Sequence, residues 1–320
     1  MNKVKIFSAL FLALAALISC NRDDDNNSAP IRDYGEQYTA DILAIETYLK
    51  THTLTVTTID GQPDVSITAI PTGNPDNLIS IWDNTAYPLQ SKIVQNDNRT
   101  SNAVDGELVD DTQYKLYYLT INTGGGATAK SIDSTYVSYR GWKLDNAEFD
   151  RNANGLWFTY PPVTSAETNA VSISGFRQIL SGMNASTGII NNPDGTFSFQ
   201  NSGVAVAFLP SGLAYFSAAR TGIPAYSPLV FTIRLHTIRE RDHDRDGVLT
   251  KYEDLNNDGN PFNDDTDGDN TPDFFDIDDD GDRVQTRFEV RDENNIRYPF
   301  ELIPTCPGGT QKRHLDPNCN

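Results

Sequence analysis

Cysteine and histidine are scarce in this sequence, which has three cysteines and four histidines among 320 residues. A chain of this kind lacks the clusters of thiolates and imidazoles that select zinc or copper. Basic residues are also few, with 25 Lys and Arg against 44 Asp and Glu and a formal net charge of −19. This balance argues against nucleic-acid binding, which requires a basic surface.

The N-terminal apolar run, residues 6–18, is too short to span a bilayer permanently and is typical of a signal peptide. It ends in Leu-Ile-Ser-Cys20, which resembles the lipobox of bacterial lipoproteins, in which the cysteine is acylated. The segment 21–27 (NRDDDNN), which contains three aspartates, resembles the surface-export signal of Bacteroidetes lipoproteins, but it also suits a plain tether. We expect a signal peptide at 1–19, a tether at 20–35 and an outer-membrane lipoprotein on the periplasmic or cell-surface side. The alternative is an ordinary signal peptide with a chance cysteine.

The other two cysteines, Cys306 and Cys319, enclose a short C-terminal loop that contains Pro and Gly. In an exported protein this pair predicts a disulfide, and two free thiols are the alternative. Closing so short a loop stabilises a fold by about 3 kcal/mol in the chain-entropy model.

Carboxylates are densest between residues 240 and 282, where about 17 acids stand against 3 bases. The stretch begins with an EF-hand loop pattern, in which oxygen ligands alternate, a glycine makes the sharp turn and a glutamate closes the 12-residue loop. The predicted ligands of this first loop are Asp242, Asp244, Asp246, the backbone carbonyl of Val248, and Glu253.

The pattern repeats at a shorter period, with Asp254, Asp265 and Asp276 at intervals of 11 residues. Glu289 could close the last unit, but it comes two places later than a loop counted from Asp276 requires, and Arg287 holds the closing position. The further predicted ligands are Asp254, Asn256, Asp258, Asp265, Asp267, Asp269, Asp276, Asp278, Asp280, Asp282 and Glu289.

These overlapping units resemble the thrombospondin type 3 calcium repeats of secreted proteins. Oxygen donors without Cys or His favour Ca²⁺ as a structural cofactor. The alternative is a solvated acidic linker without metal, although a disordered tail has no reason to keep a fixed period. Residues 240–290 are therefore predicted to be an irregular extension that binds Ca²⁺.

Before the acidic stretch, the sequence indicates an α+β fold, an antiparallel sheet wrapped over a short helix. Apolar residues at helical spacing predict an amphipathic helix over residues 34–49, and the polar residues 83–104 are predicted to be a loop. β-Branched and aromatic runs predict strands at 53–58, 65–70, 113–121, 134–139, 142–150, 156–160, 204–209 and 229–236, with a short helix near 173–183.

Five short motifs follow one another in this region. Residues 133–141 (DSTYVSYRG) resemble V-x-V-x-Y-x-G, and residues 144–150 (LDNAEFD) resemble L-x-D-G-x-x-F-D with one residue fewer. Residues 173–176 (ISGF), 208–215 (FLPSGLAY) and 223–231 (IPAYSPLVF) resemble V-I-x-G-W, I-P-P-x-L-A-Y-G and I-P-P-N-x-x-L-V-F. In this order they are similar to FKBP-type peptidyl-prolyl isomerases, and the whole chain resembles the exported FKBP-like lipoproteins of Bacteroidetes.

The resemblance implies an isomerase that uses neither a nucleophile nor a metal. Amide resonance sets the barrier to X-Pro rotation, and a dry aromatic pocket lowers it by desolvating and twisting the amide. Phe149 and Phe231 would pack on the proline ring. The implied pocket consists of Tyr139, Phe149, Asp150, Ile173, Phe176, Tyr215, Ile223, Phe231 and a wall aromatic that is either Trp157 or Phe158.

The resemblance also assigns polar roles within the pocket. Asp150 would meet the polarity of the twisted amide, and Tyr139 would hold Asp150 in place. Tyr215 would donate a hydrogen bond to the substrate carbonyl, and the backbone N–H of Ile223 would contact the substrate as well.

The chain departs from the family pattern at several places. Phe176 replaces the tryptophan of the pocket floor, and Phe216 replaces a glycine and could narrow the cleft. The loop at 224–226 differs, and residues 184–203 are an insertion.

The expected partners are unfolded or proline-containing exported polypeptides, with membrane attachment through the lipid anchor. One alternative is a module that binds prolyl peptides without catalysis, and another is a calcium-stiffened spacer with the FKBP fold as scaffold. The predicted domains after the tether are an N-terminal extension of open role, an FKBP-like domain, the calcium repeats and a disulfide-closed tail, at 36–105, 106–239, 240–290 and 291–320.

Overall fold

The computed structural model describes residues 30–59, 61–104, 106–162 and 173–319. The predicted signal peptide, the predicted lipidation site Cys20 and most of the predicted tether lie outside the described residues. The chain divides into two units, 1–31 and 32–320, and every element named below belongs to the second. Within the described ranges, no helix is long and apolar enough to cross a membrane.

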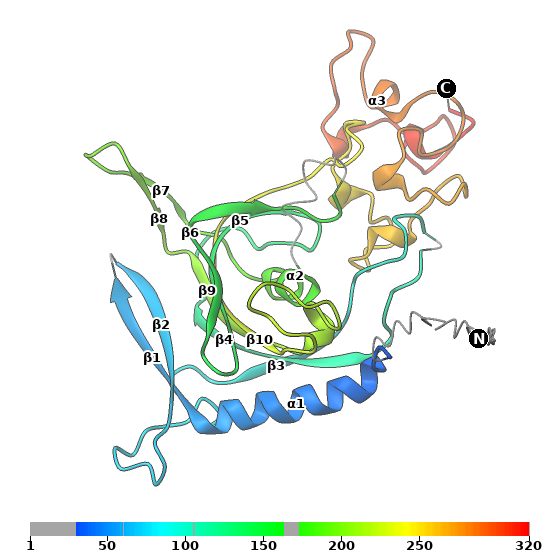
Figure 1. Ribbon diagram of the computed structural model, residues 1–320. Helices are drawn as coiled ribbons and strands as arrows, with labels where there is room; N and C mark the ends of the chain where they lie inside the picture. Colours follow the sequence, from blue (N-terminus) through cyan, green and yellow to red (C-terminus); the bar gives the residue numbers. More distant parts are fainter. Residues whose placement is uncertain (1–29, 60, 105, 163–172, 320) are drawn as a thin grey trace, which may run out of the picture. The chain divides into compact units, whose positions relative to one another are not determined.

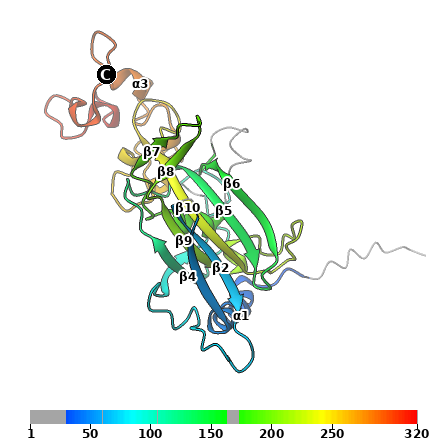
Figure 2. The ribbon, with the colours of Figure 1, turned by 90° about the vertical axis from the view of Figure 1, so that its left-hand side faces the viewer.

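A six-stranded antiparallel sheet in the order β3-β4-β9-β10-β5-β6 forms the centre of the fold (Figures 1 and 2). Its strands are β3 (Gln90–Gln95), β4 (Gln113–Asn122), β5 (Ser134–Lys143), β6 (Glu148–Phe158), β9 (Gly203–Leu209) and β10 (Leu229–Arg239). Strand β9 is buried along its whole length because both sheet faces are covered. Val206 and Phe208 face one apolar cluster, and Ala207 and Leu209 face another.

The short helix α2 (Ser174–Leu180) packs on one face, and the sheet curves around it (Figure 1). Its residues Ile179 and Leu180 are at most 4% exposed and share a cluster with Leu209. Gly175 permits the close approach, since a Cβ there would lie 2.9 Å from a methyl carbon of Leu209. The predicted α+β fold, an antiparallel sheet wrapped over a short helix, is confirmed.

The other sheet face is covered by α1 (Tyr34–Thr51) and by the hairpin of β1 (His52–Ile59) and β2 (Gln62–Ala69). Ile45 and Leu49 of α1 are 0% exposed and pack against the sheet. The predicted helix and the two strands that follow it are confirmed.

Two predictions of local structure are wrong. Residues 83–104 were expected to be a loop but include β3, an edge strand whose mostly polar sequence hides its pairing with β4. Residues 142–150 were expected to be a strand but contain the turn of the β5–β6 hairpin, where Asn146 has a φ of 62°. The insertion at 184–203 forms a hairpin of its own from β7 (Gly188–Asn191) and β8 (Phe197–Gln200).

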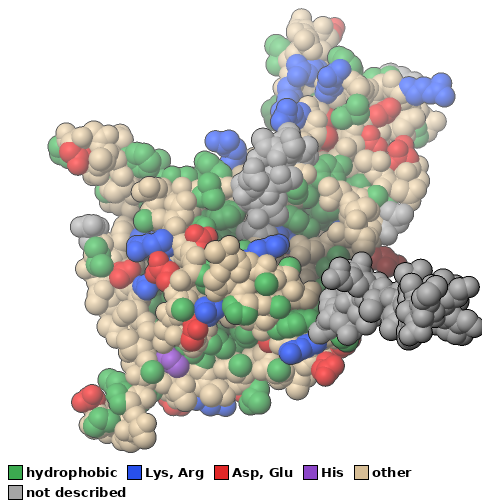
Figure 3. Space-filling view, viewed as in Figure 1, with side chains coloured by type: hydrophobic (Ala, Val, Ile, Leu, Met, Phe, Trp, Pro, Cys, Tyr) green, Lys and Arg blue, Asp and Glu red, His purple; other side chains and the backbone are tan. Residues whose placement is uncertain are grey.

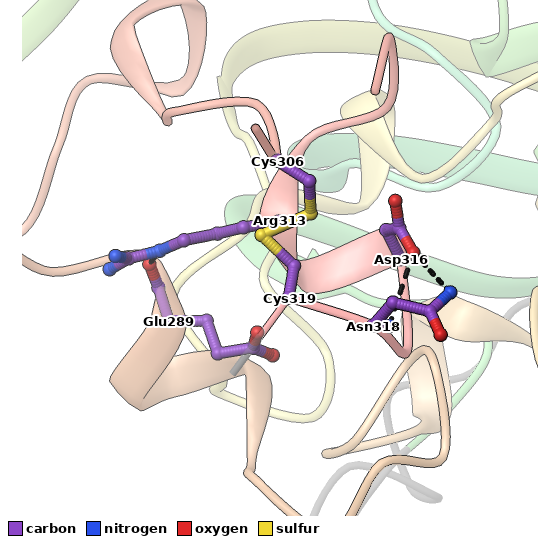
Figure 4. The surroundings of a disulfide bond; sticks show 6 residues. All are labelled: Glu289, Cys306, Arg313, Asp316, Asn318 and Cys319. Carbon is purple, nitrogen blue, oxygen red and sulfur yellow. Dashed lines mark hydrogen bonds between the residues drawn. A yellow bond between two sulfur atoms is a disulfide. The ribbon is translucent and has the colours of Figure 1, made fainter. Parts of the chain in front are cut away.

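Beyond β10, residues 240–319 contain little regular structure apart from α3 (Thr286–Glu289). In the described part of the chain, short 3-10 turns lie at Ser211–Leu213, Thr250–Tyr252, Pro261–Asn263, Asp273–Phe275, Phe300–Leu302 and Arg313–Leu315. The predicted disulfide between Cys306 and Cys319 is present, and Arg313 inside its loop donates to the Glu289 carbonyl (Figure 4). On the face seen in Figure 3, charged side chains of both signs are scattered among apolar and neutral ones.

Candidate functional site

An aromatic cluster from β5, β6, α2 and β10 lies on the α2 side of the sheet. Phe176 is 3% exposed, and its ring centroid lies 5.3 Å from that of Phe158 and 5.3 Å from that of Phe231. Tyr139 packs on Phe176 at 5.7 Å, and Phe149 packs edge-on against Phe231 at 5.5 Å. Edge-to-face pairs at these distances are attractive and rigid. The result is a buried floor edged by half-buried rings.

A β-bulge and a glycine bring the polar and apolar sides of this cluster together. Neighbours on an ideal strand point to opposite faces. The β5–β6 register shifts beside Gly141, so both Phe149 and Asp150 reach the face that carries Tyr139. A Cβ on Gly141 would lie 2.6 Å from Phe149 and 2.7 Å from Phe231, so only glycine lets these rings meet above β5.

Tyr139 joins the aromatic cluster to a carboxylate. Its hydroxyl donates a 2.7 Å hydrogen bond to Oδ2 of Asp150, which is exposed. Burial raises the pKa of Tyr139, and the hydrogen bond and negative charge of Asp150 raise it further. Tyr139 therefore remains a hydrogen-bond donor at physiological pH and holds Asp150 at the edge of the cluster.

The choice of wall aromatic, which the sequence leaves open, is decided by the strand faces of β6. Phe158 packs against the aromatic cluster, with its ring 5.9 Å from that of Tyr139. Trp157 points elsewhere, with its ring 5.3 Å from that of Tyr136 and 4.8 Å from the guanidinium carbon of Arg239. Of the two candidates for the wall aromatic, Phe158 lies in the aromatic cluster and Trp157 does not.

The turn that carries Tyr215 is fixed by helix α1. Asp41 of α1 is 2% exposed, and its Oδ2 accepts hydrogen bonds from the N–H of Ser211 at 2.7 Å and from its hydroxyl at 2.6 Å. Tyr215 follows this turn and packs half-buried against the apolar core on the α2 side of the sheet, which contains Phe176 and Phe231. Burial raises the pKa of Tyr215, and the nearby Arg220 opposes that rise. The N-terminal extension thus positions a predicted site residue.

Two apolar site residues complete the surroundings. Ile173 precedes α2 and packs half-buried on the aromatic cluster, and Ile223 is 5% exposed. The backbone N–H of Ile223 donates to the carbonyl of Arg220 at 2.9 Å, and the backbone N–H of Arg220 donates to the carbonyl of Ile223 at 2.9 Å. This differs from the expectation that the Ile223 N–H is offered to a substrate.

Phe216 serves as an anchor for α1. Its ring stacks on Tyr34 at 3.9 Å and meets Tyr226 edge-on at 5.2 Å. Among the described residues these are its ring partners, and neither of them is a ring of the aromatic cluster. Its φ of 45° lies in the left-handed region, which glycine adopts without strain.

The predicted first loop brings its carboxylates together. One oxygen each from Asp244, Asp246, Glu253 and Asp279 lies within 4.8 Å of the others. Asp242 Oδ1 is also buried and has no hydrogen-bond partner among the described atoms. Asp279 was not predicted, because it comes from a distant part of the sequence and occupies no ligand position in the repeat.

The last acidic loop has a different register from the one predicted. Asp278, Asp280 and Asp282 converge within 4.8 Å, and they stand at positions 1, 3 and 5 of a loop that Glu289 closes at position 12. Both Glu289 oxygens are buried without a partner in the described part. The loop therefore begins at Asp278 rather than two residues earlier, and the misfit of Glu289 disappears.

The same two loop positions have positive φ angles in both EF-hand-like loops. Positions 4 and 6 are Arg245 and Gly247 in the first loop, with φ of 69° and 108°. They are Gly281 and Arg283 in the last loop, with φ of 69° and 79°. In the last loop the glycine stands at position 4 and the arginine at position 6, so a search for glycine at position 6 misses this loop.

The middle loops are more exposed. Asp265, Asp267 and Asp269 offer oxygens within 4.8 Å of one another. Asp254 accepts hydrogen bonds from two backbone N–H groups of its own loop, at 3.0 Å each, and Asn256 accepts a third at 2.8 Å. The side-chain oxygens of Asp254 and Asn256 therefore point towards the backbone N–H groups of their own loop.

Burial and mutual repulsion shift the pKa values of these carboxyls upward. Burial raises the pKa of Asp244, Asp246 and Glu289, the last to about 8, and neighbouring carboxylates raise all three further. A hydrogen bond from the Val248 N–H opposes the rise in the pKa of Asp246. Burial also places the pKa values of Glu253 and Asp279 well above their ordinary range. A divalent cation would supply the positive charge that keeps such groups ionised.

Comparison with known proteins gives one family match and several similar folds. The family model described as BamM C-terminal matches residues 243–313, which hold the acidic loops and most of the disulfide loop. No curated protein matches the chain.

Among solved structures, a peptidyl-prolyl cis-trans isomerase from Pseudomonas syringae pv. tomato is 22% identical, with a TM-score of 0.30, and the match covers 39% of this chain and 76% of that one. FkpA from Escherichia coli is 25% identical with a TM-score of 0.29, and the match covers 39% of this chain and 48% of FkpA. The N-terminal domain of FKBP42 from Arabidopsis thaliana is 13% identical with a TM-score of 0.30, and the match covers 42% of this chain and 91% of that domain. These likenesses are partial, so function has to be argued from the site residues.

Proposed function

We propose that the aromatic cluster binds prolyl peptides and that the protein is a peptidyl-prolyl cis-trans isomerase for exported polypeptides. The observation that carries this proposal is the exposed Asp150 carboxylate held by Tyr139 at the edge of a buried aromatic floor. A structural core alone has no need of a carboxylate at its edge. The same bulge that aims Asp150 also brings Phe149 to the floor.

The chemistry follows from what limits the reaction. Rotation about an X-Pro bond requires loss of amide resonance, and a dry apolar site destabilises the planar, polar amide relative to the twisted one. Phe149 and Phe231 hold the proline ring. Asp150 lies where the polarity of the twisted amide develops, and Tyr215 donates to the carbonyl on the other side. No proton is transferred and no cofactor takes part.

One observation favours the alternative of prolyl-peptide binding without useful catalysis. The Ile223 N–H already donates to Arg220 within its own loop. A substrate would have to replace that bond or bind without it, and Phe176 brings no indole N–H to the floor. The donors left for the substrate are then fewer than the family resemblance implies.

Adjacent aromatic residues of β6 provide a matched test. Phe158 packs on the aromatic cluster and Trp157 does not. In a protease-free isomerisation assay followed by NMR exchange, Phe158→Ala should lower kcat/KM by about tenfold or more, and Trp157→Ala should leave it nearly unchanged. A wild-type rate no higher than that of a Phe149→Ala/Asp150→Ala variant would sink the enzyme proposal. Peptide binding without rate enhancement would then establish the binding module.

We further propose that residues 240–290 bind Ca²⁺ and that the ions replace the apolar core that so acidic a segment cannot build. Orphaned buried oxygens of Glu253, Asp279 and Glu289 support this proposal. Affinity in the range of about 10⁻⁴–10⁻³ M, usual for extracellular modules, makes the ions constitutive outside the cell. Calcium titration by calorimetry tests it, and an absence of heat together with indifference to EDTA would refute it.

Export and anchoring at Cys20 complete the proposed setting, an outer-membrane lipoprotein on the periplasmic or surface side. Labelling with a fatty-acid analogue in the producing cell should mark the wild-type chain and not Cys20→Ala. Labelling of both chains, or of neither, would count against the anchor.

A further inference from the structure

Asp279 lies in the last acidic loop, residues 278–289, but its carboxylate belongs to the carboxylate group of the first loop, residues 242–253. Asp279 is 1% exposed and Glu253 is 2% exposed. Both oxygens of each are buried and lack a hydrogen-bond partner among the described atoms. An unpaired buried carboxylate costs several kcal/mol, and a bound cation would offset that cost.

The number and type of the unpaired oxygens identify the cation class. Asp244 and Asp246 each contribute one buried, unpartnered oxygen, and Glu253 and Asp279 contribute two each, which makes six from the four residues that converge. Ca²⁺ takes six to eight oxygens in a flexible arrangement, whereas Mg²⁺ demands an octahedron and retains water. A site built from so many carboxylate oxygens fits Ca²⁺.

We propose that the Ca²⁺ of the first loop takes Asp279 as a ligand from the last loop, so that one ion joins the two ends of the acidic segment and couples the two EF-hand-like sites. This inference rests on the calcium proposal above and adds a cross-loop ligand to it. The consequence is that the two sites fill together rather than independently.

The coupling has a short physical route. Asp279 follows Asp278, which is the first ligand of the last loop. The backbone N–H of Asp279 donates to the Thr286 hydroxyl at 3.1 Å, and Thr286 begins the helix α3 that ends in Glu289. An ion that holds Asp279 therefore also positions the first and the closing ligands of the last loop.

The C-terminal disulfide loop contacts the end of the last acidic loop. Arg313 donates from its guanidinium to the backbone carbonyls of Glu289 and Arg291. It lies between Glu289 and the Cys306–Cys319 bond in Figure 4. The last loop is thus held from both sides, and the first-loop ion completes the connection.

Calcium titration of the full chain tests the inference, with ion number from native mass spectrometry and affinities from calorimetry. Asp279→Asn keeps the side-chain shape and the backbone bond to Thr286 but removes the charge. We expect it to lose the first-loop ion and to weaken the last-loop ion by about tenfold or more. Asp269→Asn in the more exposed middle loop is the matched control and should affect one ion alone.

A second variant guards against simple misfolding. Glu253→Gln should lose the same ion as Asp279→Asn, and the double variant should lose no more than either. Unchanged ion number and affinity in Asp279→Asn would overturn the cross-loop ligand while leaving the calcium proposal intact. Loss of a single ion with an unaltered last loop would overturn the coupling. A wild-type chain that binds no Ca²⁺ would refute the calcium proposal itself.

Discussion

The hydroxyl of Tyr139 donates a hydrogen bond of 2.7 Å to Oδ2 of Asp150 across the β5–β6 pair. The bond joins a half-buried ring to an exposed carboxylate. It holds the carboxylate at the edge of the aromatic cluster, where the proposed substrate amide would lie.

Removing this bond should reduce activity with little loss of stability. Tyr139→Phe keeps the ring packing on Phe176 but frees the Asp150 carboxylate to rotate. A hydrogen bond of this kind is worth about 1.4 kcal/mol, so kcat/KM should fall by about tenfold. Urea unfolding of the same variant should show a free energy within about 1.5 kcal/mol of wild type. Full activity in Tyr139→Phe would contradict the assigned role of Asp150.

Phe216 should matter for stability and not for catalysis. Its ring is 8% exposed and stacks on Tyr34. Phe216→Ala leaves a cavity under α1 and should lower the free energy of unfolding by about 3 kcal/mol. Phe197, which is 56% exposed, provides the control, because Phe197→Ala should change it by less than about 0.5 kcal/mol. A gain of isomerase activity in Phe216→Ala would mean that this ring does obstruct the cleft.

The register of the last acidic loop can be tested by two neighbouring substitutions. A loop that begins at Asp278 closes at Glu289, whereas a loop that begins at Asp276 closes at Arg287. Glu289→Gln should weaken Ca²⁺ binding to the last loop by about tenfold or more. Arg287→Gln should leave it unchanged. Thermal unfolding as a function of Ca²⁺ concentration measures both, and the reverse ranking would restore the register predicted from sequence.

His236 should make stability depend on pH. Its ring nitrogens lie 2.9 Å from the Ser138 hydroxyl and 3.2 Å from the Ser202 hydroxyl, and Phe199 stacks on it at 4.4 Å. Burial, helped by the charge of Arg234, lowers the pKa of His236 from 6.5 to about 4.

The unfolded chain therefore binds more protons than the folded chain between pH 4 and 6.5. The contribution of neutral His236 to the free energy of unfolding is fully present above pH 6.5. It declines by up to about 3 kcal/mol as the pH falls towards 4. In saturating Ca²⁺, His236→Gln should flatten this part of the pH profile by up to one proton, as measured by urea unfolding. His314, whose pKa is also lowered to about 4, keeps the remaining slope. An identical slope in the variant would contradict a buried neutral His236.

Periodicity allowed much of the fold to be predicted. Apolar residues at helical spacing indicate α1, because Ile45 and Leu49 must both face the sheet. Apolar and β-branched runs likewise indicate β4, β9 and β10. Strand β3 escapes this logic, since an edge strand with an exposed face needs no apolar alternation. Its place in the sheet comes from pairing with β4, which no local pattern encodes.

The candidate site likewise has features that the sequence predicts and features that only the tertiary structure decides. The sequence motifs supplied the aromatic residues through a family resemblance, whereas residue type and spacing by themselves supplied the acidic period and the cysteine pair. Tertiary structure decided between Phe158 and Trp157, and it brought Phe149 and Asp150 to one face, because strand register and a bulge set where side chains point. The tertiary structure also placed a carboxylate oxygen of Asp279 within 4.8 Å of one from Glu253. Convergence of groups far apart in sequence depends on the path of the whole chain, which no local spacing records.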